Sequence, residues 1–200
     1  MVIIMNEEIK KIKNEHFDQV FQLMKSSFPV DEYRTYEEQK ELLNNSAYSI
    51  YARYDAVDSI TSFIALWEFD EFIFIEHFAV DEGSRNTGLG TKMLNEIIER
   101  FDKRICLEVE PPEGELSRRR IDFYKRNKFF LSEYPYTQPA MSEGKKAIPL
   151  FIMTTNGEVD EETFEQIRST LYTEVYKCDT SFEKALNKAG INSKKVKEML

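Results

Sequence analysis

The sequence predicts a mixed α/β (α+β) fold in which helices flank a largely antiparallel, twisted sheet of six to seven strands. Three observations indicate this class. The first part of the chain carries successive strand-like runs separated by short polar turns, as in antiparallel hairpins. A glycine-bearing loop then joins the last of these runs to a strongly amphipathic helix. Further strand-like and helix-like segments alternate after that helix.

Two helices and three strands are expected in the first eighty residues. Apolar side chains recur at helical spacing over residues 17–24. Thr35 and Glu38 form a capping box, which opens a second helix that continues through Leu43. The expected strands cover residues 46–53, 59–67 and 72–80.

Helices and strands alternate in the second half. After Gly90, the apolar side chains of Met93, Ile97 and Phe101 recur on one face of an expected helix. A second helix carries the pair Phe123 and Tyr124. The expected strands cover residues 104–110, 129–133 and 147–154.

Length and composition fit one compact domain. The chain has 200 residues, 42% of them hydrophobic, with only seven Gly and six Pro. We expect residues 1–155 to form the domain. An amphipathic helix at residues 160–177 and a Lys-bearing tail at 181–200 form a C-terminal extension, residues 156–200, which we expect to pack on the same domain.

Charge and residue usage exclude several classes of function. A net charge of −9 argues against nucleic acid as a partner and suits a cationic small substrate. No apolar run approaches the length of a membrane span, and residues 1–13 are too polar for a signal peptide. Only two cysteines, Cys106 and Cys178, are present, which favours a reducing, cytoplasmic location. Two histidines and no cysteine cluster predict that no metal is bound.

The most informative segment is the loop R-N-T-G-L-G-T at residues 85–91. A strand, a glycine-bearing turn and a helix N-terminus together present backbone N–H groups and the positive end of a helix dipole, which favours phosphate binding. Gly88 and Gly90 allow the backbone to approach a ligand closely. An ordinary tight turn between strand and helix is the alternative.

Two commoner phosphate loops do not match these residues. A dinucleotide fingerprint that started at Gly88 would need glycine where the chain has Met93. A P-loop that started at Gly83 would continue with Lys and Ser or Thr, whereas the chain has Leu89 and Gly90. Both motifs are therefore rejected.

The order of motifs resembles the GNAT family of N-acetyltransferases. Residues 72–90, with an apolar pair at the strand end and an R-x-x-G-x-G loop, are similar to the acetyl-CoA-binding motif of that family. Residues 118–129, R-R-R-I-D-F-Y-K-R-N-K-F, are similar to its later helix with a Phe-Tyr pair. The resemblance covers roughly residues 57–154 and implies the GNAT-like acyl-CoA N-acyltransferase fold.

The resemblance also implies an activity and a cofactor. We expect an N-acetyltransferase that transfers an acetyl group from acetyl-CoA to a primary amine of a small molecule or protein, by direct attack in a ternary complex. A non-catalytic acyl-CoA-binding sensor or regulatory module is the alternative. The residues implied in cofactor binding are Phe78, Ala79, Val80, Arg85, Asn86, Thr87, Gly88, Leu89, Gly90, Thr91 and Arg120.

Two residues are expected to move protons. Tyr124 matches the family's tyrosine that serves as general acid for the departing thiolate, and simple packing beside Phe123 is the alternative. Glu76 alternates with Phe78 on one face of its strand and matches a position that carries the base in some relatives, provided that burial raises its pKa. Pairing of Glu76 with an Arg or Lys is the alternative. His77, expected on the other face, is the rival base.

The acceptor site is expected in two loops. The loop after the first helix offers Asp31, Glu32, Tyr33 and Arg34, and the stretch at residues 134–144 offers Tyr136 and Gln138. A plain linker loop is the alternative for both. The C-terminal extension is expected to close this pocket, to pack in a homodimer or to cap the sheet. One departure from the family pattern concerns the end of the Phe-Tyr helix, where Asn127 is expected to take the left-handed conformation usual for glycine.

Overall fold

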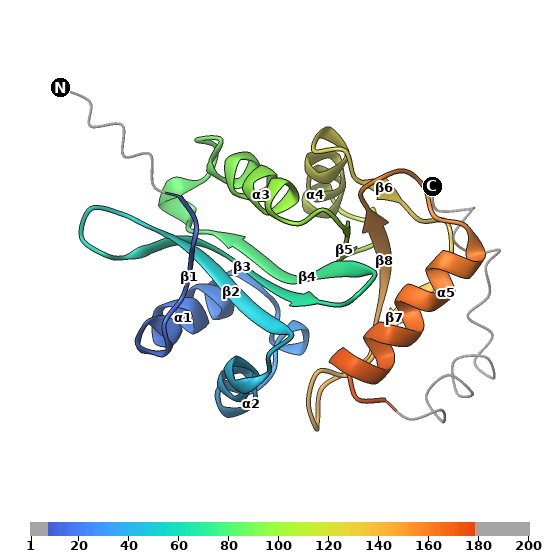
Figure 1. The fold of residues 1–200 in the computed structure, drawn as a ribbon, viewed down its shortest axis with the longest axis horizontal. Coiled ribbons are helices and arrows are strands. Elements are labelled where there is room, and N and C mark those ends of the chain that lie inside the picture. Colours follow the sequence, from blue (N-terminus) through green and yellow to red (C-terminus); the bar gives the residue numbers. More distant parts are fainter. Residues whose placement is uncertain (1–7, 179–200) are drawn as a thin grey trace. The chain divides into compact units, whose positions relative to one another are not determined.

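The computed structural model describes residues 8–178 and consists of two compact units (Figure 1). Within the described residues, the first unit covers residues 8–105 and the second covers residues 106–178. The strands that pair within each unit are antiparallel, which agrees with the predicted sheet.

The first unit contains a four-stranded antiparallel meander. Strand β1 (Lys10–Lys11) pairs with β2, β2 pairs with β3, and β3 pairs with β4. The three long strands are β2 (Tyr48–Tyr54), β3 (Ile60–Glu68) and β4 (Phe72–Val80). They confirm the three strands expected here, whereas the two-residue strand β1 was not expected.

Helices cover both faces of this meander. Figure 1 shows α1 (Phe17–Ser27) and α2 (Tyr36–Glu41) on one side of the strands and α3 (Leu89–Arg100) on the other. Each long helix buries one apolar stripe; for α3 the buried side chains are Met93, Leu94 and Ile97. Short 3₁₀ turns join these elements: η1 (Asn14–His16), η2 (Val30–Glu32), η3 (Leu42–Asn44) and η4 (Glu82–Ser84).

The predicted capping box at the start of α2 is confirmed. The Glu38 N–H donates to Thr35 Oγ1 at 3.3 Å, and the Thr35 N–H donates to a carboxylate oxygen of Glu38 at 3.1 Å. Two N–H groups that a helix N-terminus leaves without partners are therefore satisfied by side chains from the same helix end.

Strand β4 carries a β-bulge at Glu76. Ala65 of β3 pairs with His77, but the next residue, Leu66, pairs with Ile75. Glu76 therefore has no partner on β3, and the alternation of side chains between the two faces is interrupted at this point.

The second unit is built around β8 (Ile148–Thr154). This strand pairs with β5 (Arg104–Val109), β6 (Phe130–Leu131) and β7 (Tyr136–Gln138). Strand β7 lies inside the stretch 134–144, which was expected to be a loop. Its pairing with β8 brings the described chain to eight strands, two of them with only two residues.

The sequence predicted one amphipathic helix at residues 160–177, but the C-terminal segment is not one continuous α-helix. Helix α5 (Glu161–Thr170) continues as a π-helical turn, η5 (Leu171–Val175), in which the Tyr176 N–H donates to Leu171 O at 3.0 Å. The Tyr172 hydroxyl donates to Thr137 O at 2.8 Å, so this turn is tied to β7. The predicted tail at residues 181–200 lies outside the described residues.

Helix α4 (Glu115–Arg126) ends in a Schellman motif. The Phe129 N–H donates to Tyr124 O at 3.0 Å and the Lys128 N–H donates to Lys125 O at 3.1 Å. The left-handed residue is Lys128, with φ 65°, and not Asn127, with φ −94°. The prediction for Asn127 was wrong because its side chain amide instead donates to Phe123 O at 2.7 Å, inside the helix.

Within residues 8–178, no helix has the length and apolar character that crossing a membrane requires.

Lys128→Gly is expected to stabilise the protein by roughly 0.5–1 kcal/mol, because a left-handed conformation strains a residue with a Cβ atom more than it strains glycine. Urea denaturation of the two proteins measures this. The control is Lys125→Gly in the same helix, which removes the same side chain at a right-handed position and should destabilise by up to about 1 kcal/mol. Equal losses in both variants would contradict the assignment of strain to Lys128.

Candidate functional site

The loop between β4 and α3 is shaped by its own hydrogen bonds. The Arg85 Nε–H donates to Val80 O at 3.2 Å, and the Thr87 hydroxyl donates to Ser84 O at 2.7 Å. Asn86 and Gly88 take positive φ values of 62° and 82°. These contacts fold the loop back at the end of β4 and direct the chain into α3.

The N-terminus of α3 can accept an anion. Gly88 is the N-cap and supplies no side-chain cap, and the first bond within the helix runs from the Lys92 N–H to Gly88 O at 3.0 Å. The N–H groups of Leu89, Gly90 and Thr91 precede that bond and sit at the positive end of the helix dipole. Because residues 85–88 are exposed, a ligand can reach these groups from solvent.

The remaining predicted cofactor residues lie on β4 and α4. Phe78, Ala79 and Val80 are the last residues of β4 and pair with β3. Arg120 lies in α4 of the second unit, where its Nη1–H donates to Glu110 Oε2 at 2.9 Å. Most neighbouring cations of α4 are exposed, as expected for a solvated basic face.

Glu76 is part of a buried ion pair. Arg34, which follows η2, donates from Nη1 to Glu76 Oε1 at 2.6 Å. Their side chains are 7% and 1% exposed. The structure therefore favours the alternative that the sequence left open, a carboxylate paired with an arginine.

His77 and Glu76 contact the same segment of the chain. His77 Nε2 lies 2.8 Å from Glu32 O and therefore donates to it, since a carbonyl oxygen can only accept. Its Nδ1 lies 3.5 Å from Glu76 Oε2. The expectation that the two side chains lie on opposite faces of β4 was wrong, because the bulge at Glu76 interrupts the alternation.

The electrostatics of Glu76 differ from those of a general base. Burial raises the pKa of its carboxyl group, but the Arg34 guanidinium and the adjacent His77 lower this pKa by a larger amount. The resulting pKa is about 2. The predicted rise in pKa therefore does not occur. Glu76 is a permanently ionised carboxylate at neutral pH, and its side chain is almost inaccessible to solvent.

The predicted acceptor residues of the first unit immediately precede Arg34 in the sequence. Asp31 and Glu32 belong to η2, and Tyr33 follows it with its ring against that of Phe21, at 5.9 Å between centroids. All three are half-buried. Arg34, which the sequence also placed in this acceptor loop, instead pairs with Glu76.

Tyr124 is held at the end of α4 by the Schellman motif. Its ring contacts those of Phe123 and Phe129, with centroids 5.2 and 5.6 Å away. Burial raises the pKa of the phenol to about 12, against the opposing effect of Arg120. Tyr124 therefore keeps its proton at neutral pH, and within residues 8–178 its hydroxyl makes no hydrogen bond.

Sequence reasoning missed a second carboxylate, Glu108, which is hydrogen-bonded to two tyrosines of the second unit. Glu108 on β5 accepts hydrogen bonds from Tyr136 of β7 and from Tyr176, the latter at 2.9 and 2.8 Å. Tyr136 and Gln138 are buried in β7 and do not line a loop. The strand-like pattern of residues 104–110 places Glu108 on a strand, but nothing in the sequence predicts that Glu108 lies beside these two phenols.

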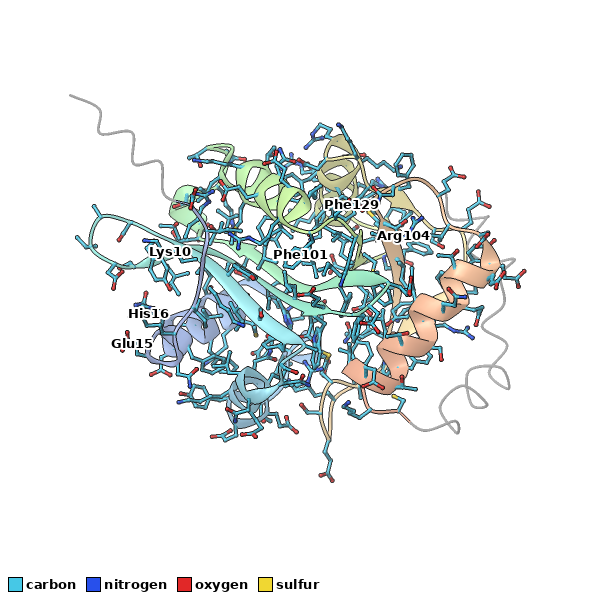
Figure 2. The ribbon with its side chains drawn as sticks, in the orientation of Figure 1. Lys10, Glu15, His16, Phe101, Arg104 and Phe129 are labelled. Carbon is cyan, nitrogen blue, oxygen red and sulfur yellow. The ribbon has the colours of Figure 1, made fainter. Side chains whose placement is uncertain are left out.

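A polar pocket in the first unit contains none of the predicted site residues. His16 Nδ1 lies 3.0 Å from the Tyr54 hydroxyl, and His16 Nε2 lies 3.6 Å from Asp58 Oδ2. Lys10, Glu15 and His16 of this pocket are labelled in Figure 2. Lys13 Nζ also lies 3.7 Å from Glu15 Oε1, so part of the charge in this pocket is paired within it. Its lining residues are Lys10, Lys11, Lys13, Glu15, His16, Tyr54, Asp55 and Asp58.

The described residues contain no cluster of three or more His, Cys, Asp or Glu side chains that could hold a metal ion. Cys106 is buried and Cys178 is half-buried, and neither forms a disulfide.

Comparison with known proteins connects these features to one family. Residues 17–129 match the sequence model of the acetyltransferase (GNAT) family. YjbC of Bacillus subtilis (strain 168), which is named as an acetyltransferase, is 27% identical over 155 residues, 75% of this chain and 78% of that protein.

Solved structures agree with this match. A GNAT-family structure from Bacteroides thetaiotaomicron is 34% identical, with a TM-score of 0.80 over 86% of this chain and 100% of that one. An aminoglycoside 6'-N-acetyltransferase in complex with coenzyme A is 17% identical, with a TM-score of 0.54 over 74% of this chain and 96% of that one, and shares the fold.

Glu76→Gln is expected to lose stability in a pH-dependent way. The folded-state pKa of about 2 lies below the ordinary value of 4.5, so the ionised carboxylate stabilises the fold above pH 4.5 and this contribution disappears as the pH falls through 2. The shift corresponds to roughly 3 kcal/mol. Urea denaturation of wild type and variant at several pH values should show a difference that shrinks from pH 6 towards pH 2. A difference that is constant with pH would contradict the pairing with Arg34.

Proposed function

Because the chain belongs to the acetyltransferase (GNAT) family, we propose that it transfers an acetyl group from acetyl-CoA to a primary amine of a small molecule or protein by direct attack in a ternary complex. The observation that carries this proposal is the loop at residues 85–91, which lies within the segment that matches the family and leads into the uncapped N-terminus of α3. Acetyl-CoA supplies the activated acyl group as a thioester.

We assign the phosphate-bearing part of the cofactor to this loop. The fit rests on the φ of 82° at Gly88, on the three N–H groups before the first helical bond, and on the exposure of the loop. Phe78, Ala79 and Val80 at the end of β4, together with Arg120 on α4, complete the proposed contacts. No loop carboxylate between Arg85 and Thr91 opposes an anion.

Tyr124 is the proposed general acid. Its phenol carries a proton at neutral pH, because burial raises its pKa to about 12. Its ring is fixed between Phe123 and Phe129, so that little conformational entropy is lost when the group acts. Within the described residues, no group accepts a hydrogen bond from the Tyr124 hydroxyl. Its proton is therefore available for transfer to the departing thiolate of coenzyme A.

Glu76 supports the acceptor site without acting as a strong base. A carboxylate with a pKa of about 2 has little affinity for a proton at neutral pH, and the Glu76 side chain is only 1% exposed, so Glu76 is poorly suited to take the proton of an ammonium acceptor. Asp31, Glu32 and Tyr33 in the first unit remain the proposed acceptor contacts, whereas Tyr136 and Gln138 are too deeply buried in β7 to contact an acceptor.

We also propose that residues 156–178 fold as part of the acetyltransferase. The support is that Tyr172 donates to Thr137 of β7 and Tyr176 donates to Glu108 of β5. An independent domain would not share hydrogen bonds of this kind with strands of the second unit.

Acetyl-CoA at about 100 times its dissociation constant should stabilise the protein by roughly 2.7 kcal/mol, which is a rise in Tm of about 5–10 °C. Gly88→Val should abolish the rise, because valine strongly disfavours the φ of 82° that the loop requires. Gly157→Val is the matched control, since Gly157 has a φ of 94° outside the loop. Loss of the rise in both variants, or its absence in the wild type, would contradict the cofactor site.

Tyr124→Phe should lower kcat for amine acetylation about 10²–10⁴-fold, the usual contribution of general acid–base catalysis. The acetyl-CoA thermal shift should persist, because the ring and its packing remain. Release of the free thiol measures turnover, and Tyr51→Phe, a change on β2, controls for loss of a phenol. Equal turnover of Tyr124→Phe and wild type would remove Tyr124 from the acid role; absence of turnover in both, with a retained thermal shift, would favour the non-catalytic module.

A further inference from the structure

Helix α3 is attached to strand β2 by two polar contacts in addition to its apolar stripe. The Arg53 Nη2–H donates to Glu96 Oε1. The Arg100 guanidinium lies over the face of the Tyr51 ring, 5.1 Å from its centroid, and this contact does not use the hydroxyl. Tyr51 and Arg53 alternate along β2 and therefore point to one face of the sheet. Glu96 and Arg100 are four residues apart and therefore lie on one face of the helix.

Glu96 also holds the chain at the start of β1. Its Oε2 accepts a hydrogen bond from the Ile9 N–H at 3.2 Å, one residue before β1 begins. The two oxygens of one carboxylate therefore accept from two neighbouring segments of the sheet. The Arg53 and Glu96 side chains are 4% and 25% exposed, so their attraction is only weakly screened by salt.

These contacts determine what the apolar stripe of α3 leaves open. Met93, Leu94 and Ile97 are buried, but the burial of apolar surface has no preferred direction. A helix that slides by one residue, about 1.5 Å along its axis, can keep much of this burial. A hydrogen bond that is stretched by the same distance is broken. The contacts of Glu96 therefore determine the axial position and the rotation of α3 on the sheet.

The axial position of α3 matters for the proposed cofactor site. The N–H groups of residues 89–91 begin the helix, and their hydrogen bonds to phosphate oxygens require a narrow range of distances. Glu96 follows Leu89 by seven residues, which is about 10 Å along the helix axis. Glu96 therefore cannot bind a ligand at the N-terminus, and its effect on such a ligand must act through the helix.

We propose that Glu96 is a positioning residue of the acetyl-CoA site, which holds α3 against β1 and β2 so that the N–H groups at the helix N-terminus meet the cofactor phosphates. This inference rests on the proposed transfer of an acetyl group from acetyl-CoA. It gives a role in cofactor affinity to a carboxylate whose own charge repels the cofactor.

The direction of the effect separates positioning from simple electrostatics. Glu96→Gln removes a negative charge about 10 Å from a bound anion, so charge alone predicts equal or tighter binding. Loss of positioning predicts that the Kd for coenzyme A rises at least tenfold, as measured by titration calorimetry well below the Tm of the variant. The matched control is Glu99→Gln, which removes the same charge at an exposed position of α3, and its Kd should stay within twofold of wild type.

Two outcomes of this titration would overturn the positioning role. One is a Kd for Glu96→Gln that is within twofold of wild type or lower. The other is an equal rise in Glu96→Gln and Glu99→Gln, because an exposed carboxylate holds nothing in place.

A double variant covers the case in which Glu96→Gln does not fold because Arg53 has lost its carboxylate. Arg53→Met with Glu96→Met removes both charges of the pair and leaves neither uncompensated, so the fold should persist. The Kd for coenzyme A should still rise at least tenfold, since the directional contact is lost. Wild-type affinity in this variant would show that apolar packing alone positions α3, and would contradict the proposal.

Amide NMR signals of the bound state give a readout that lower stability alone would not change. Saturating coenzyme A should shift the signals of residues 89–91 in the wild type and in Glu99→Gln, and by less than half as much in Glu96→Gln. Equal shifts in all three proteins would overturn this inference and leave the proposed function intact. Failure of the wild type to bind coenzyme A would overturn the proposed function and this inference together.

Discussion

The buried ion pair between Arg34 and Glu76 is the constraint on which the candidate acceptor region of the first unit depends. A carboxylate that is 1% exposed cannot remain ionised without a partner, and the partner comes from the loop between α1 and α2. The loop must therefore lie against β4 wherever Glu76 lies. The bulge at Glu76 adds His77 to the same contact, so one irregular residue in a strand determines the course of a distant loop.

A comparable arrangement joins the elements of the second unit. Glu108 of β5 accepts the phenols of Tyr136 and Tyr176, which come from β7 and from the segment after η5. Burial and the Glu108 charge raise the pKa of Tyr136 well above its ordinary range, so this phenol remains a donor. The C-terminal segment is therefore attached to a strand nearly seventy residues earlier through one carboxylate.

The two units supply different parts of the proposed chemistry. The first provides a loop at the N-terminus of α3 that suits an anion. The second provides Tyr124, a phenol that keeps its proton because it is buried. The basicity expected of Glu76 is absent for the same reason that its position is so well defined: the cation that orients it also lowers its pKa.

The sequence alone determined the features that depend on neighbours close in the chain. The capping box of Thr35 and Glu38, the apolar stripe of α3 and the glycine turn at Gly88 follow from local spacing and backbone preference, and the family motifs are built from such segments. Tertiary structure decided the bulge at Glu76, its pairing with Arg34 and strand β7. Each of these depends on a hydrogen-bond partner, a buried charge or a strand register that residues distant in sequence supply, and no local periodicity encodes such a partner.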